Sequence, residues 1–86
     1  MNAEVELMTR AGCAMCAAAA AHLERVLADY GLVARLVDVD EAAAEGRPQL
    51  RAEYGDRVPV VVLDGEEHSY WEVDEPQLRA DLDARR

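Results

Sequence analysis

The chain contains no Lys, Ile or Phe, and only two of its 86 residues are Cys. It has no apolar run near the roughly 18 residues that a membrane-spanning helix needs, and no basic-then-apolar leader at its start. We therefore expect neither a membrane partner nor a signal peptide. Positive charge is also scarce, because 18 acidic residues outnumber 9 Arg and give a net charge of −9. This balance argues against a nucleic acid partner, since binding to phosphate backbones requires basic surface.

The length and the cysteine count narrow the class of protein further. A chain of 86 residues, 51% of them hydrophobic, is expected to form one domain over residues 1–86 around a single core of sheet and helices. We expect this domain to be a monomer. Two cysteines without a secretory leader are typical of the reducing cytoplasm, where a cysteine pair is catalytic or metal-binding rather than a structural crosslink.

Both cysteines belong to one motif, Cys13-Ala14-Met15-Cys16, at a predicted junction of strand and helix. Residues 5–9 alternate apolar and polar side chains, as a half-buried strand does. Gly12 supplies a tight turn, and the alanine run over residues 17–21 strongly favours a helix. The predicted local structure is therefore strand, turn, Cys-x-x-Cys and helix.

This placement gives the two thiols different roles. Cys13 lies at the start of the helix, where unpaired backbone N–H groups and the helix dipole make a thiol more readily ionised. Cys16 lies one turn later, on an apolar stripe that includes Leu23 and Tyr30 and is spaced to face a core. The pattern predicts that Cys13 attacks a disulfide and that Cys16 resolves the product.

The remaining elements follow from similar patterns. The first helix is expected to run from residue 13 to 30 and to end at Gly31, a residue suited to a left-handed cap. A second strand is predicted over residues 32–39, and a strand–helix–strand unit of this span implies a parallel pair with a right-handed crossover. Asp40 is expected to cap a short helical turn through Ala44, and a further helix should begin near Pro48.

The last third of the chain reads as a hairpin followed by a helix. Residues 58–63 are expected to form an apolar strand, and Asp64-Gly65 is a strong hairpin signal. The return strand covers roughly residues 67–72, with Trp71 and Val73 facing inward. A final helix is expected to be capped by Asp74, with Gln77 in the capping-box position and with Leu78 and Leu82 on its inner face. The resulting fold class is α/β, with a four-stranded mixed sheet in the order β-α-β-α-β-β-α.

The motif TRAGCAMC at residues 9–16 resembles the active-site region of proteins with the thioredoxin fold. Val58-Pro59 before an apolar strand, and then an Asp-Gly hairpin, resemble the second half of that pattern. Over about residues 4–84 the chain is similar to glutaredoxins, especially the compact bacterial glutaredoxin-like family of the DUF836 type. The resemblance implies a thioredoxin fold and a thiol–disulfide oxidoreductase activity.

The resemblance also implies roles for individual residues. Cys13 would be the nucleophile and Cys16 the resolving thiol. Pro59 would be a cis-proline that faces the disulfide, and Val58 would offer backbone hydrogen bonds to a thiol substrate.

Two further positions would bind glutathione by this resemblance. Arg10 stands where a basic residue helps to hold the glutathione carboxylate, and Asp74 is the one remaining counterpart of a Gly-Gly-x-Asp turn that binds the γ-glutamyl end. The chain departs from glutaredoxins at Ala14 and Met15, where they usually have Pro and an aromatic residue, and in having Tyr70–Val73 before Asp74.

Three function classes follow from these patterns. The first is an oxidoreductase with no tightly bound cofactor and no metal, which uses glutathione or another low-molecular-weight thiol as co-substrate. Its partners would be disulfide-containing proteins or small thiols, and a reductase or thiol pool; glutathione, mycothiol and thioredoxin reductase all remain open as the source of electrons. The second is a metal or iron–sulfur carrier that uses Cys13. The third is a thioredoxin-fold interaction module with little turnover.

Overall fold

Four strands form one mixed sheet in the order β2-β1-β3-β4. The computed structural model describes residues 1–86. The strands are β1 (Val5–Thr9), β2 (Arg35–Asp38), β3 (Val60–Leu63) and β4 (Glu66–Tyr70). β1 pairs with β2 in parallel, and β3 is antiparallel to both β1 and β4. The predicted four-stranded mixed sheet is therefore confirmed.

Four helices accompany the sheet. They are α1 (Ala14–Ala28), α2 (Val39–Ala44), α3 (Gln49–Tyr54) and α4 (Glu75–Asp83). The middle helical region consists of two short helices, as predicted, and Gly46 ends the first of them with a φ of +93°. The turn is closed by Arg47 N–H, which donates to Ala42 O at 2.8 Å. None of the helices is long and apolar enough to span a membrane.

Two predicted boundaries around β2 are wrong. The strand starts at Arg35 rather than at residue 32, because Leu32 N–H donates to Leu27 O and so completes the end of α1 instead of joining the sheet. Gly31 has the expected left-handed backbone, with a φ of +67°. At the other end, Asp38 rather than Asp40 caps α2, since its Oδ1 accepts the N–H groups of Asp40 and Glu41.

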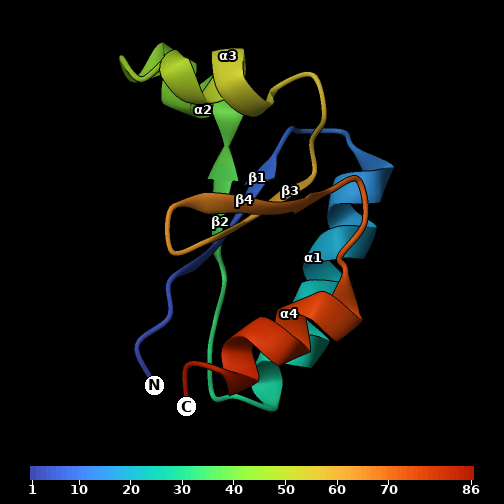
Figure 1. Ribbon diagram of the computed structural model, residues 1–86. Coiled ribbons are helices and arrows are strands. Elements are labelled where there is room, and N and C mark those ends of the chain that lie inside the picture. The colour runs from blue at the N-terminus through green and yellow to red at the C-terminus, as the bar shows by residue number, and fades with distance from the viewer.

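The main core lies on the sheet face that α1 and α4 cover (Figure 1). Its eleven buried residues come from β1, α1, β3, the loop after β4, and α4. They are Val5, Leu7, Ala19, Leu23, Val26, Leu27, Val61, Leu63, Val73, Leu78 and Leu82. The predicted apolar faces of the first and last helices are thus confirmed. The alternation along β1 sends Val5 and Leu7 to this face.

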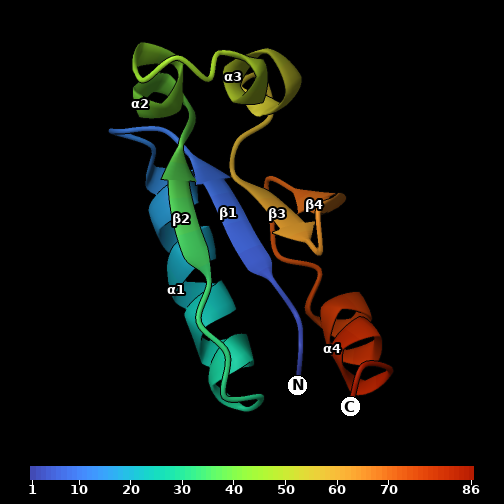
Figure 2. The same ribbon diagram turned by 90° about the vertical axis from the view of Figure 1, so that its left-hand side faces the viewer.

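A smaller core lies on the opposite face, at the end of the sheet where α2 and α3 gather (Figure 2). It contains Met8, Val37, Val39, Val60 and Val62, with Leu50 and Tyr54 of α3 packed against them. The carboxyl ends of β1, β2 and β4 and the start of β3 meet at this end of the sheet. The redox motif follows β1 directly, so it lies at the same end.

Candidate active site

Cys13 is the N-cap of α1. Gly12 precedes it with a φ of +71°, a backbone conformation that favours glycine, and Cys13 itself remains extended. Its Sγ accepts the backbone N–H of Cys16 at 3.1 Å. A sulfur in this position takes up one of the unpaired N–H groups of the first turn and lies at the positive end of the helix dipole. The Cys13 side chain is half-buried, so its sulfur remains accessible from solvent.

Cys16 has the opposite environment, because it lies under the first turn of α1 with only 4% of its surface exposed. Burial, and then the hydrogen bond with Cys13, raise the pKa of the Cys16 thiol from its ordinary value to about 11. The two cysteines thus differ in access, as the helix pattern predicted. With this pKa, the Cys16 thiol is protonated at neutral pH.

We predict that the two thiols of the reduced protein react with iodoacetamide in strict order at pH 8. A thiol with a pKa near 11 is only about 0.1% ionised at pH 8, and Cys16 is also buried, so Cys13 should be labelled first. Labelling of Cys16 should accelerate as the pH rises toward 11. Peptide mass spectrometry at pH 8 and pH 10.5 measures both rates, with urea-unfolded protein as the control. Equal rates for the two native cysteines at pH 8 would contradict the assignment.

The Val58–Pro59 peptide bond is cis, as the resemblance implied. Pro59 is fully buried at the entrance to β3, and its carbonyl oxygen accepts the N–H of Trp71 at 2.7 Å. This bond ties the start of β3 to the loop that follows β4. Both segments reach the end of the sheet where α1 begins (Figure 1). Val58 and Pro59 are thus at the same end of the sheet as the cysteine pair, and their role in substrate binding remains a prediction.

Arg10 is tied to α2 and α3 by hydrogen bonds. Its Nε and Nη2 donate to the two carboxylate oxygens of Asp40 at 3.1 and 3.2 Å, and its Nη1 donates to Gly55 O at 3.0 Å. The hydrogen bond from Arg10 lowers the pKa of Asp40. Asp40 also lies 3.6 Å from Arg51. The guanidinium therefore fixes the loop before Cys13, and the binding of a substrate carboxylate by Arg10 remains a prediction.

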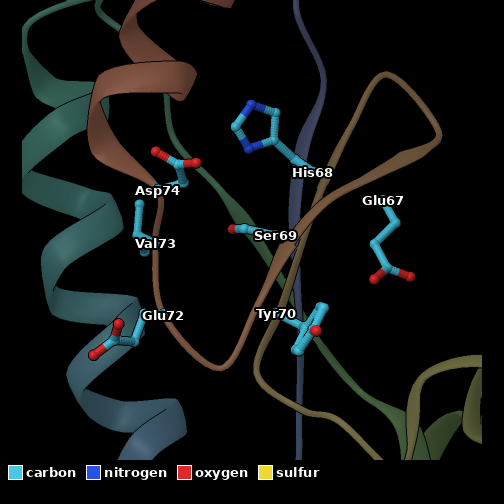
Figure 3. Close-up of a pocket in the computed structure, with 7 residues that line it drawn as sticks. All are labelled: Glu67, His68, Ser69, Tyr70, Glu72, Val73 and Asp74. Carbon is cyan, nitrogen blue, oxygen red and sulfur yellow. The ribbon is translucent and has the colours of Figure 1, made fainter.

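Asp74 caps α4, as predicted, because its Oδ1 accepts the N–H of Gln77 at 3.2 Å. The Gln77 side chain bonds to Asp81 instead of returning to the cap. Asp74 lines a hollow of about 580 Å³ beside β4, together with His68, Ser69, Glu72 and other residues (Figure 3). Neither cysteine lines this hollow. In the structure Asp74 thus serves as a helix cap, and its contact with a thiol ligand remains a prediction.

The prediction that Trp71 faces inward is wrong. β4 ends at Tyr70, and Trp71 takes a φ of +68°, so the alternation of the strand stops and 53% of the Trp71 side chain is exposed. Val73 is buried, as predicted. Trp71, Glu72 and Met15 instead line a groove between α1 and this loop. Sequence reasoning missed this groove, because only the positive φ at Trp71 reveals it, and a non-glycine residue gives no signal for one.

No three His, Cys, Asp or Glu side chains gather into a cluster that could hold a metal ion. His22 bonds to Glu75 through Nε2 at 2.6 Å, and His68 bonds to Asp81 at 2.8 Å. Both contacts attach α4 to the rest of the molecule. A metal carried by Cys13 would consequently need ligands from another molecule.

Three features define a protein of the thioredoxin fold: the mixed sheet, the Cys-x-x-Cys pair that caps a helix, and the cis-proline. The model of the glutaredoxin-like domain (DUF836) matches residues 4–83, and the chain belongs to this family. It is 58% identical over 79 residues to the uncharacterized protein Rv0508 of Mycobacterium tuberculosis and to Mb0520 of Mycobacterium bovis, which covers 92% of this chain and 81% of each relative.

A solved structure is also similar. The X-ray structure of the Northeast Structural Genomics target protein XcR50 from X. campestris is 33% identical and has a TM-score of 0.60. The match covers 93% of this chain and 96% of that one. The agreement over nearly the whole length of both chains confirms the predicted fold class. The match of the glutaredoxin-like domain model confirms the predicted family, which suggests thiol redox chemistry.

Proposed function

We propose that the chain is a thiol–disulfide oxidoreductase that uses the Cys13–Cys16 dithiol to reduce disulfides in proteins or small molecules. The observation that supports this most strongly is the asymmetry of the pair. Cys13 caps α1 and accepts the N–H of Cys16, whereas Cys16 is buried and its pKa is raised to about 11. An attacking thiolate beside a protonated resolving thiol is what stepwise exchange requires.

The proposed reaction has two exchanges. The Cys13 thiolate attacks one sulfur of a substrate disulfide, forms a mixed disulfide, and releases the other substrate sulfur as a thiolate that takes a proton. Cys16 then loses its proton and attacks Cys13 Sγ, which forms the Cys13–Cys16 disulfide and releases the second substrate thiol. The substrate gains two electrons and two protons: both electrons come from the cysteine pair, one proton comes from Cys16, and the other comes from solvent. A low-molecular-weight thiol or a dithiol reductase would return the electrons in the cytoplasm.

The first test of this function is reversible oxidation. Mild oxidation should join Cys13 to Cys16 within one chain and lower its mass by two hydrogens, because the residues are one helical turn apart. Titration against a dithiol buffer should give a midpoint between roughly −270 and −120 mV, the range of related pairs. Turnover of the neutral substrate hydroxyethyl disulfide, with glutathione or a dithiol as reductant, completes the test. Two free thiols that persist under oxidant would contradict the proposal.

A further inference from the structure

Three large apolar side chains are exposed near the cysteine motif. Met15 lies within the motif and is 52% exposed, and Tyr70 and Trp71 at the end of β4 are 49% and 53% exposed. The Tyr70 and Trp71 rings meet edge to face, with centroids 5.0 Å apart. Large apolar side chains gathered on a surface mark an interaction site.

A groove of about 360 Å³ adjoins this surface. Met15, Ala18, Ala19 and His22 line it from α1, and Trp71, Glu72 and Val73 line it from the loop after β4. The small alanine side chains leave the groove open. Because Met15 stands two residues after Cys13, a substrate joined to Cys13 would have its neighbouring residues within reach of this groove.

Trp71 is held in its exposed position by the backbone. Its φ of +68° is uncommon for a residue other than glycine and persists only where the surroundings enforce it. The hydrogen bond from Trp71 N–H to Pro59 O, 2.7 Å long, supplies this constraint. The backbone of this loop thus directs Trp71 outward, beside the redox site, rather than into the core.

The unpaired charge of the groove is negative. Glu72 points from its loop toward α1, away from Tyr70 (Figure 3), and its carboxylate has no hydrogen bond or ion pair. His22, the other ionisable side chain of the groove, is bonded to Glu75, which Arg79 also binds. Outside the groove, the Arg10 guanidinium is bound to Asp40 and Gly55 O.

We propose that this groove selects disulfides whose reactive cysteine has an adjacent Arg or Lys. The apolar stem of that side chain would lie on Met15 and Trp71, and its cationic head would pair with Glu72 and with the indole face. A thiol that bears carboxylates would bind less well, because Glu72 repels its negative charge. Arg10 cannot compensate, since its guanidinium is already bound to Asp40 and Gly55 O. The inference rests on the proposed function and names its substrate class as basic protein or peptide disulfides.

The test compares three symmetrical disulfides of blocked tripeptides: Ac-Arg-Cys-Ala-NH₂, Ac-Gln-Cys-Ala-NH₂ and Ac-Glu-Cys-Ala-NH₂. We expect kcat/KM to be about tenfold higher for the Arg peptide than for the Glu peptide at low ionic strength, and the ratio to fall in 0.5 M salt. Glu72→Gln should reduce this ratio to about twofold, and Glu72→Arg should reverse the order. Trp71→Ala should lower the rates for the Arg peptide most.

Glu66→Gln is the matched control, because Glu66 is an exposed, unpaired carboxylate at the far end of β4 and its loss changes the net charge equally. It should leave the ratio unchanged. Equal rates for the three peptides, with normal turnover of hydroxyethyl disulfide, would overturn the inference and leave the proposed function standing.

Absence of turnover with every disulfide would contradict the proposed function instead. Binding of Ac-Arg-Ser-Ala-NH₂ and Ac-Glu-Ser-Ala-NH₂ would then decide the inference, measured by the fluorescence of Trp71, the single tryptophan. Preference for the Arg peptide, lost in Glu72→Gln, would support it, and equal binding would overturn it.

Discussion

Cys13→Ser is expected to abolish disulfide reduction, with kcat/KM lowered by roughly 10³-fold or more. A serine hydroxyl stays protonated at neutral pH, and its oxygen cannot form the mixed disulfide through which the reaction passes. The fold should tolerate the change, because serine is a preferred N-cap and can accept the N–H of Cys16 as the Cys13 sulfur does. Turnover of hydroxyethyl disulfide measures the loss, and thermal unfolding checks that the protein remains folded.

Cys16→Ser is the matched control, because it removes the other sulfur and leaves the cap intact. This variant should still attack disulfides but should stop at the mixed disulfide, which mass spectrometry would detect as a covalent adduct on Cys13. If Cys16→Ser lost all reaction with disulfides and Cys13→Ser formed adducts, the roles of the two cysteines would be reversed.

Local sequence rules predicted the features of the site that depend on local backbone. The helix begins at the cysteine motif, Gly31 ends it, and Asp64-Gly65 forms the hairpin with φ values of +51° and +84°. Each of these depends on caps, turns and glycine, whose preferences act over a few residues. The burial of Cys16 followed from helical periodicity alone.

The features that were not predicted depend on contacts between distant segments. Trp71 is turned outward by a bond to Pro59, twelve residues earlier in the chain. Arg10 is bound by Asp40 and Gly55, which the sequence places 30 and 45 residues away. Patterns within a single sequence do not predict which distant residues will bond to one another. The groove beside the cysteines and the pairing of Arg10 are therefore seen only in the folded chain.

The loop that carries Trp71 and Glu72 is anchored by the main core. Val73 directly follows these residues and belongs to the buried cluster that α1 and α4 share. Asp74 then caps α4, and Leu78 N–H donates to Asp74 O at 2.9 Å. Two exposed residues that form the groove are thus followed by a buried residue and a helix cap. The rigidity of the groove consequently depends on how well α4 packs.

Leu78→Ala is expected to lower the free energy of unfolding by about 2–5 kcal/mol, a large share of the roughly 5–15 kcal/mol that stabilises a typical domain. Leu78 lies on α4 and is fully buried in the main core against residues of α1 and the sheet, so truncating its side chain leaves a cavity there. Alanine has the highest helix propensity, so the lost free energy of unfolding measures the lost packing and not a weaker tendency to form a helix. Urea unfolding followed by circular dichroism measures the change.

Leu36→Ala provides the comparison, because Leu36 is 59% exposed on the edge strand β2 and its loss opens no cavity. Its cost should stay within about 0.5 kcal/mol, the usual range for surface substitutions. Leu78→Ala should also broaden the fluorescence of Trp71 at urea concentrations below the unfolding transition, since the loop before α4 loses its anchor. Equal costs for the two substitutions would mean that α4 is not part of the cooperative core and that the groove does not depend on it.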